Sequence, residues 1–445
     1  MHPEAVDDTA VARRGDEHGV AVTEYLGIMV AVAVLIGALI SVVTPGVPRT
    51  IVDGLTVAVG RMVGGDAPDL TAPARPGADG IAATGRPSSD AVAAPADPWA
   101  APLDDPDAAF AAVDGPRAVD RLAALGGRER RLLLDEAHRR STDAEAPLDV
   151  RVGANQLLLA ATVFDVTSVG AAGGTDQATG TGSGGLDRHE RYDRWLQEDR
   201  QLIWFDPADD GRVAEVVAGR LDEADRVAVV VPGTGNDVDT FDTSTRQYAR
   251  NLADTIDDLD PDADAAVVAC LCYDAPDSLL EARHGRYAEE GAEGLAAVTD
   301  DIRHLAAEEA TMTVMGHSYG ATALGHAITD AGLTADETVS LGGPGLGRTV
   351  DSVDDLPDGA GRVWGVRHDK DPIALAAWVH GRNPDDPAFG AGGFTVGDGD
   401  VTRRWWPYQA EFHGIYLVDE VSRRNLALVT LGRADEVDGL REGRP

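Results

Sequence analysis

The chain has 445 residues, and its 76 acidic against 38 basic residues give a formal net charge of −38. This charge excludes a nucleic-acid-binding protein, because binding to phosphates needs a basic face. A hydrophobic content of 43% excludes wholesale disorder. The two cysteines, Cys270 and Cys272, are too few for a disulfide framework or a Cys/His zinc cluster.

Residues 25–43, YLGIMVAVAVLIGALISVV, contain no charged side chain. At 1.5 Å per residue such a helix spans about the 30 Å of a bilayer's hydrocarbon core, and it is longer than the apolar region of a cleaved signal peptide. We therefore expect a single transmembrane helix over 25–43, preceded by a leader over 1–24. Charge does not set its orientation, because arginines flank it on both sides, at 13 and 14 and at 49 and 61.

The segment that enters this helix resembles the processing site of Flp-type prepilins, with Gly19, then Glu24 five residues later, then Tyr25. The resemblance implies a cytoplasmic leader, cleavage by a prepilin peptidase after Gly19, and a catalytic domain outside the cytoplasmic membrane. The alternative is an ordinary anchor in which Glu24 is an interfacial carboxylate.

The next part of the chain has two compositions. Residues 44–106 are rich in Pro, Ala and Gly, which is typical of a linker. Residues 107–200 are expected to form a helical pre-domain, because leucines recur at helical spacing and a second helix is indicated over 152–166. A glycine-rich loop over 170–185 and a third helix over 187–201 lead into a strand over 202–205.

Residues 201–435 alternate short apolar runs with amphipathic stretches, and residues 436–445 form a tail. The runs are nearly all apolar, which is typical of parallel strands buried on both faces; they cover 227–231, 265–271, 311–315, 339–341 and 363–366. Helices are expected between them over 245–259 and 287–307. The fold class predicted is a mostly parallel, doubly wound α/β sheet.

The strongest motif is G-H-S-Y-G over 316–320, between an apolar strand and a helix that starts with small residues. This is the pattern of a nucleophile elbow, in which flanking glycines allow a strained turn. Ser318 is thus the candidate nucleophile, at a helix N-terminus that favours developing negative charge.

A second motif, Pro232-Gly233-Thr234-Gly235, follows the strand over 227–231. Such a loop supplies the second amide of an oxyanion hole, so the backbone amides of Thr234 and Tyr319 are the candidate donors. The alternative, a phosphate-binding loop, is weak because neither G-K-[ST] nor G-x-G-x-x-G is present.

Chain order then predicts an acid after a later strand and a histidine near the end. Asp369 and Asp371 both follow the strand over 363–366, and His380 and His413 lie downstream. His413 precedes a helical stretch, which suits a catalytic base, whereas His380 suits a loop or pocket. Two further histidines, 317 and 326, are expected to be structural.

Several segments together resemble a poorly characterised α/β-hydrolase family of high-GC bacteria, over residues 110–432. They are 200–206 through 231–235, 273–276, the elbow, 342–345, 371–373 and 380–390. The resemblance implies Ser318 as nucleophile, Asp371 as acid and His413 as base. Cys272 departs from it, because the family tends to have glycine before Tyr273, and we expect a local packing change there.

The function expected is a membrane-anchored serine hydrolase that cleaves an ester-like acyl bond in a small-molecule or lipid substrate, through an acyl-enzyme and with no cofactor or metal. The location expected is the cell membrane, with a single span and an extracytoplasmic catalytic domain. Two alternatives stay open: an acyltransferase with the same triad, and a pilus- or surface-associated binding protein on a hydrolase scaffold.

Overall fold

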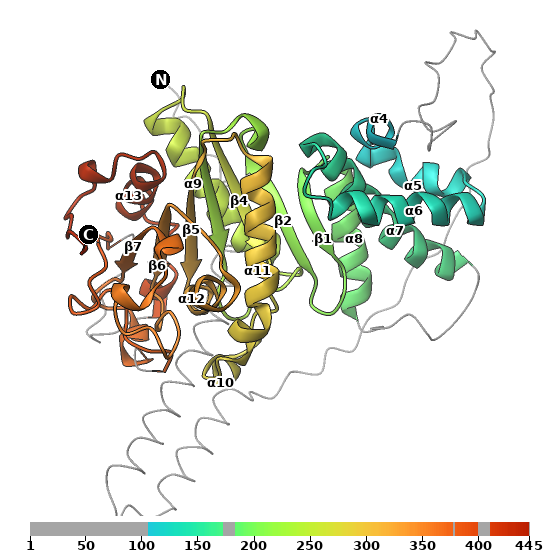
Figure 1. Cartoon of the computed structure of the whole chain (residues 1–445). Coiled ribbons are helices and arrows are strands. Elements are labelled where there is room, and N and C mark those ends of the chain that lie inside the picture. The colour runs from blue at the N-terminus through green and yellow to red at the C-terminus, as the bar shows by residue number, and fades with distance from the viewer. Residues whose placement is uncertain (1–105, 172–182, 377–378, 399–409, 445) are drawn as a thin grey trace, which may run out of the picture.

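The computed structural model describes residues 106–171, 183–376, 379–398 and 410–444 (Figure 1). The leader, the expected transmembrane helix over 25–43 and the linker up to residue 105 lie outside this part of the chain, as does most of the glycine-rich loop. Among the helices within these ranges, none combines the length and apolar character needed to cross a bilayer.

The described residues before 200 form helices gathered beside one edge of the sheet (Figure 1). They are α4 (Pro106–Ala111), α5 (Gly115–Ala124), α6 (Gly127–Ser141), α7 (Leu148–Ala171) and α8 (Ser183–Gln197). Their buried apolar side chains, among them Leu122, Leu157 and Trp195, join the core on one face of the sheet. The helix expected over 152–166 is the inner part of α7, and α8 starts and ends four residues before the prediction.

A seven-stranded sheet forms the centre of the molecule, in the order β1-β2-β4-β3-β5-β6-β7. The strands are β1 (Leu202–Asp206), β2 (Arg212–Ala218), β3 (Arg226–Val231), β4 (Ala265–Leu271), β5 (Thr311–His317), β6 (Glu337–Leu341) and β7 (Arg362–Val366). Strands β4, β3, β5, β6 and β7 pair in parallel, whereas β2 runs antiparallel to both neighbours. The predicted mostly parallel α/β sheet is confirmed.

Helices cover both faces of the sheet, because alternate strand residues point to opposite sides. In β3, Val227 and Val229 pack with α11 (Arg286–Leu305) and α12 (Tyr319–Ala331), while Ala228 and Val230 pack with α9 (Thr245–Leu259) and α13 (Glu420–Thr430). A short helix, α10 (Leu279–Ala282), precedes α11. The carboxyl ends of the parallel strands therefore open onto one edge between two helical layers, where ligands bind in such folds.

Strand β2 was not predicted from the sequence, because Glu215 interrupts its apolar pattern. Its carboxylate is buried, with Arg246 Nε 2.9 Å from Oε1 and Arg200 Nη1 3.4 Å from Oε2. Arg200 also reaches Asp242 Oδ1 at 2.6 Å. Burial raises the pKa of the Glu215 carboxyl, and the two arginines oppose that rise. The network connects the end of the pre-domain to β2 and α9.

Candidate active site

Ser318 lies in a tight turn between β5 and α12. Its φ of 54° and ψ of −125° lie in a region that non-glycine residues rarely adopt, so the backbone is strained at this position. The turn needs glycine beside it, since a Cβ on Gly320 would lie 2.4 Å from the Pro232 carbonyl oxygen and one on Gly316 would lie 2.6 Å from the Gly320 oxygen. The turn places the serine at the N-terminus of α12.

The structure brings together the three side chains that the sequence predicted as a triad. The Nε2 atom of His413 is 2.7 Å from Ser318 Oγ, and its Nδ1 atom lies 3.0 and 2.9 Å from the two carboxylate oxygens of Asp371. A carboxylate accepts hydrogen bonds only, so Nδ1 carries the proton and Nε2 is the acceptor for the serine hydroxyl. All three residues are buried, Asp371 completely.

The Asp371 carboxylate is held by groups besides His413. Its Oδ1 accepts the Ile373 amide at 2.8 Å, and its Oδ2 accepts the Tyr416 hydroxyl in a short hydrogen bond. The other carboxylate that the sequence offered, Asp369, is exposed. Of the two candidates the structure therefore places Asp371, and not Asp369, against the histidine.

Two residues with no predicted role at the site pack against the triad. The His317 Nε2 atom donates to the His413 carbonyl oxygen at 2.7 Å, and its ring lies 5.1 Å from the His413 ring and 6.0 Å from the Tyr416 ring. Burial, followed by the nearby His413, lowers the pKa of His317 to about 4, so the ring is neutral at physiological pH. Tyr416 also accepts the His368 amide, and its hydroxyl thus bridges two segments of the chain. In the sequence, the only indication that His317 lies near the triad was its position between the elbow glycines.

The segments that carry the acid and the base are packed together by a ring stack. The Phe412 ring stacks on His368 at 4.1 Å, and the Lys370 ammonium lies 4.9 Å from the centre of the same ring. His368 and Lys370 both pair with Asp398. These contacts fix the backbone on which His413 and Asp371 are carried.

The loop over 232–235 lies against the nucleophile, with its carbonyl groups turned to other partners. The Tyr273 hydroxyl donates to the Pro232 oxygen at 2.8 Å, and Asn236 Nδ2 donates to the oxygens of Gly233 and Thr234 at 3.0 and 3.3 Å. A further hydrogen bond, 2.8 Å long, joins the Gly235 amide to the Pro276 oxygen. The loop is therefore held on one side by Asn236 and on the other by the segment over 273–276.

The contact between this loop and Ser318 is close. A Cβ on Gly233 would lie 2.7 Å from Ser318 Cβ and 3.2 Å from the Tyr319 nitrogen. Within the described ranges, the backbone amides of Thr234 and Tyr319 donate to no hydrogen-bond acceptor. These are the two amides that the sequence proposed for an oxyanion hole.

The segment that supports the loop begins with the two cysteines. Cys270 and Cys272 form a disulfide, which the sequence analysis did not predict. The two residues lie two positions apart on the same side of the end of β4, with Cα atoms 5.1 Å apart, which is within disulfide range. Tyr273 follows directly and is fully buried against Gly291. The disulfide and the buried Tyr273 ring are the packing that the structure shows at the end of β4.

Several carboxyl groups lie near the segment that supports this loop. Burial, followed by the neighbouring Asp210, raises the pKa values of Asp274 and Asp277, which flank Pro276. Asp237 also contributes to the raised pKa of Asp277. Several carboxyls therefore lie near Pro276, with Arg212 as a group of opposite charge beside Asp274.

The other candidate histidines lie away from the serine. His380 is buried, donates from Nε2 to the Ala282 oxygen at 2.6 Å and has its ring edge-on to Tyr319, while His326 pairs with Asp330. His380 therefore packs beneath the elbow and is not positioned as a base. In the described part of the chain, no three His, Cys, Asp or Glu side chains gather as a metal site would require.

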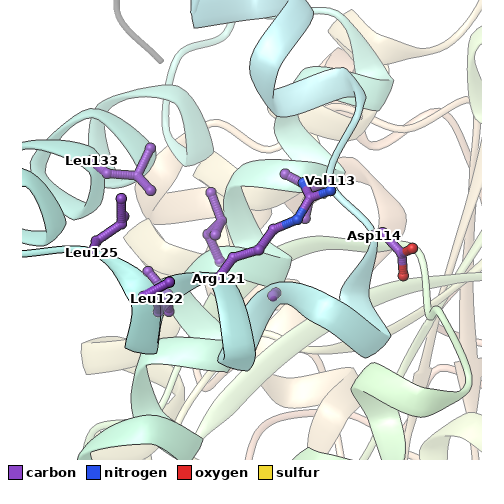
Figure 2. A pocket seen from close by; sticks show the side chains of 9 residues that line it. Val113, Asp114, Arg121, Leu122, Leu125 and Leu133 are labelled. Carbon is purple, nitrogen blue, oxygen red and sulfur yellow. The ribbon is translucent and has the colours of Figure 1, made fainter. Parts of the chain in front are cut away.

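A small cavity of about 100 Å³ lies among α5, α6 and α7, in the pre-domain. Figure 2 shows leucines 122, 125 and 133 on one side of it and Asp114 on the other. None of its lining residues belongs to the triad or to the loop over 232–235, so it is separate from the candidate active site.

Comparisons with known proteins give one family match and distant relatives. Residues 206–380 match the model of a family described as alpha/beta hydrolase. An uncharacterized protein of Mycobacterium tuberculosis, present in strains CDC 1551 and H37Rv, is 32% identical over 200 residues, which are 43% of this chain and 30% of the relative. The chain thus spans less than a third of the length of these relatives.

The solved structures that match this chain share little sequence with it. A serine hydrolase without lid from Xanthomonas campestris is 15% identical, covering 50% of this chain and 89% of its own, with a TM-score of 0.30. A carboxylesterase from Mesorhizobium loti is 14% identical, covering 40% and 85%, with a TM-score of 0.27. The family match and the mostly parallel sheet give this chain an alpha/beta hydrolase fold.

Proposed function

We propose that this chain is a serine hydrolase that cleaves an ester-like acyl bond through an acyl-enzyme. The observation that carries the proposal is the chain of hydrogen bonds from Ser318 Oγ through the His413 ring to the Asp371 carboxylate. The strained backbone at Ser318 adds support, because a protein that only binds ligands has no need of such a turn.

The tautomer of His413 determines the direction of proton transfer. Because Nδ1–H is directed at Asp371, the Nε2 lone pair faces the hydroxyl and takes the Ser318 proton as Oγ attacks the acyl carbon. The Asp371 carboxylate stabilises the imidazolium that results. His413 then returns the proton to the leaving group, and the acyl group remains on the serine.

The oxyanion formed in this step meets the amides of Thr234 and Tyr319 and the positive end of α12. Each such donor typically contributes about 10²–10³ in turnover. In the second half of the reaction, His413 deprotonates a water molecule, which attacks the acyl-enzyme and releases the acid. Because several carboxyl groups lie near the segment that supports the loop, we expect neutral esters to be preferred over anionic ones.

The experiment is hydrolysis of p-nitrophenyl acetate, with detection of both p-nitrophenol and free acetate. Ser318→Ala is expected to abolish turnover, whereas Ser352→Ala, a control at the cap of the short turn over 353–355, is expected to leave it unchanged. Unfolding temperatures of both variants should stay near the wild-type value. Residual activity of Ser318→Ala within about threefold of wild type would refute the proposal.

The proposal includes a membrane anchor at residues 25–43, with cleavage after Gly19 and the catalytic domain outside the cytoplasmic membrane. Its support is the sequence: nineteen uncharged residues directly after the Gly19–Glu24–Tyr25 pattern. N-terminal sequencing of the membrane fraction and protease accessibility in spheroplasts test it. An uncut Met1 would refute the cleavage, and a catalytic domain protected until the membrane is opened would refute the topology.

A further inference from the structure

The segment over 237–243, which continues directly from the loop over 232–235, is bound by charged side chains of the pre-domain. Asp239 lies between two arginines of α8, with Arg188 Nη2 3.2 Å from its Oδ2 atom and Arg191 Nη1 in contact with its Oδ1 atom. Burial opposes the ionisation of Asp239, but the two arginines outweigh burial and lower the pKa of this carboxyl. Asp239 is therefore a charged carboxylate that two cations of α8 hold in place.

A second carboxylate of the same segment is held in a similar way. Asp242 accepts the Trp195 indole N–H at 3.1 Å, and it lies 2.6 Å from Arg200 Nη1 and 3.3 Å from Arg194 Nη2. Between the two carboxylates, the Phe241 ring is fully buried and lies 5.6 Å from the Trp195 ring. The pre-domain therefore contacts the segment through charged groups and through aromatic packing.

Local hydrogen bonds connect this segment to the loop that carries the candidate oxyanion amide. Asp237 and Thr240 close a turn around Asp239, because the Thr240 amide donates to Asp237 Oδ1 at 2.8 Å and the Asp237 amide donates to Thr240 Oγ1 at 3.0 Å. The residue before this turn, Asn236, donates from Nδ2 to the Thr234 oxygen at 3.3 Å. Asp239 lies only five positions after Thr234, so a displacement of its carboxylate is passed on to the Thr234 backbone.

We propose that Asp239, bound by Arg188 and Arg191, is a positioning residue for the Thr234 amide, and that α8 thereby holds the loop in its catalytic position. The proposal rests on the serine mechanism given above and adds a role for the pre-domain to it. An amide stabilises an oxyanion only within hydrogen-bond distance of the oxygen on which the charge develops. A displaced loop therefore slows the chemical step more than it weakens substrate binding.

The pre-domain also offers a matched control, because another of its arginines forms an ion pair away from the loop. Arg151 of α7 has its Nη1 atom 2.8 Å from Oδ2 of Asp301, which lies on α11. Arg151 is fully buried, so we expect the loss of this pair to cost at least as much stability as the loss of the Asp239 pair. Both pairs dock the pre-domain, but only the Asp239 pair contacts the segment that continues from the loop.

The test compares Asp239→Asn and Asp301→Asn, each of which replaces a carboxylate by a neutral side chain of the same size, with Asp239→Glu, which keeps the charge. Arg191→Gln removes the other side of the contact, and it is also combined with Asp239→Asn in a double variant. The measurements are kcat and KM for p-nitrophenyl acetate, the rate of inactivation by a fluorophosphonate, and the unfolding temperature.

For Asp239→Asn we expect kcat to fall about tenfold, with KM unchanged and inactivation slowed in parallel, because both reactions build a tetrahedral oxyanion. Arg191→Gln is expected to lower kcat as well, and the double variant to lose no more than Asp239→Asn, since both residues act through one contact. Asp239→Glu is expected to retain kcat within about threefold. Asp301→Asn is expected to keep the wild-type kcat even though its unfolding temperature falls.

The proposal is overturned if Asp239→Asn and Asp301→Asn change kcat equally, because the pre-domain would then act only by being docked. It is also overturned if Asp239→Asn raises KM alone, or if the losses of Asp239→Asn and Arg191→Gln add up in the double variant. If Asp239→Asn does not fold, Arg191→Gln decides the question, and a wild-type kcat of that variant refutes the proposal.

Ser318→Ala separates this proposal from the serine mechanism. If Ser318→Ala is inactive while Asp239→Asn has full kcat, the serine mechanism stands and positioning by Asp239 is refuted. If Ser318→Ala remains active, the serine mechanism is refuted, and with it the positioning of an oxyanion donor.

Discussion

The buried His317 ring predicts a specific dependence of stability on pH. It faces the rings of Tyr248, His413 and Tyr416, and Asp371 is the charged group nearby. Burial and the neighbouring His413 lower its pKa from 6.5 to about 4, whereas Asp371 acts in the opposite direction and does not outweigh them. The fold therefore requires His317 to be neutral.

The size of the effect follows from the two pKa values. Between pH 6.5 and about 4 the unfolded chain binds a proton that the folded chain does not, so the free energy of unfolding rises with pH in this window. The stabilisation is complete above the unfolded pKa and is lost as the pH falls towards the folded one. From about pH 7.5 to about pH 5 the loss is about 2 kcal/mol.

The assay is urea unfolding at these two pH values for the wild type and His317→Gln. A glutamine amide does not titrate and can still donate to the His413 oxygen, so the carboxylates that titrate elsewhere contribute equally to both proteins. We expect the wild type to lose about 2 kcal/mol more than the variant on acidification. Equal losses would show that His317 is not held neutral by burial.

Three further predictions follow from the contacts of the site and of the sheet. In ester hydrolysis, Asp371→Asn is expected to lower kcat by about 10³–10⁴ and Asp369→Asn far less, because only Asp371 contacts His413. The reverse ranking would assign the acid to Asp369. Tyr273→Phe removes the hydrogen bond to the Pro232 oxygen, so it should lower kcat about tenfold at unchanged KM and cost about 1 kcal/mol of stability. A wild-type kcat would show that Tyr273 does not support the oxyanion loop. Glu215→Ala leaves buried Arg200 without one of its partners, so it should lower the free energy of unfolding in urea by about 3–5 kcal/mol, against less than about 0.5 kcal/mol for exposed Glu223→Ala. Similar losses for the two variants would contradict the effect of burial.

The parallel strands could be predicted because each is a short apolar run with helical sequence on both sides. The prediction for α9 agrees with its bounds of Thr245–Leu259, since its apolar residues follow the helical period without interruption. Strand β2 could not be predicted. Its central Glu215 is neutralised by Arg200 and Arg246, which lie 15 and 31 residues away, and nothing within a local window shows such partners.

The candidate site likewise has residues that could be predicted from the sequence and residues that could not. That Ser318, Asp371 and His413 lie together could be predicted, because the elbow motif and the chain order of such sites have local signatures. The contact of His317 with the His413 carbonyl joins residues 96 positions apart, and that of Tyr416 with Asp371 joins residues 45 apart. The neighbours of His317 and Tyr416 become known only once the strands are assembled. The expected leader and anchor lie outside the described residues and stay predictions.

Activation of Ser318 by His413 can be measured by reaction with a fluorophosphonate, followed by mass spectrometry of the labelled peptide. We expect one adduct, on Ser318. Labelling should be absent from Ser318→Ala and strongly slowed in His413→Ala, because the serine hydroxyl then has no base 2.7 Å away. Labelling of Ser318→Ala at the wild-type rate, or an adduct on another residue, would contradict the activation of Ser318 by His413.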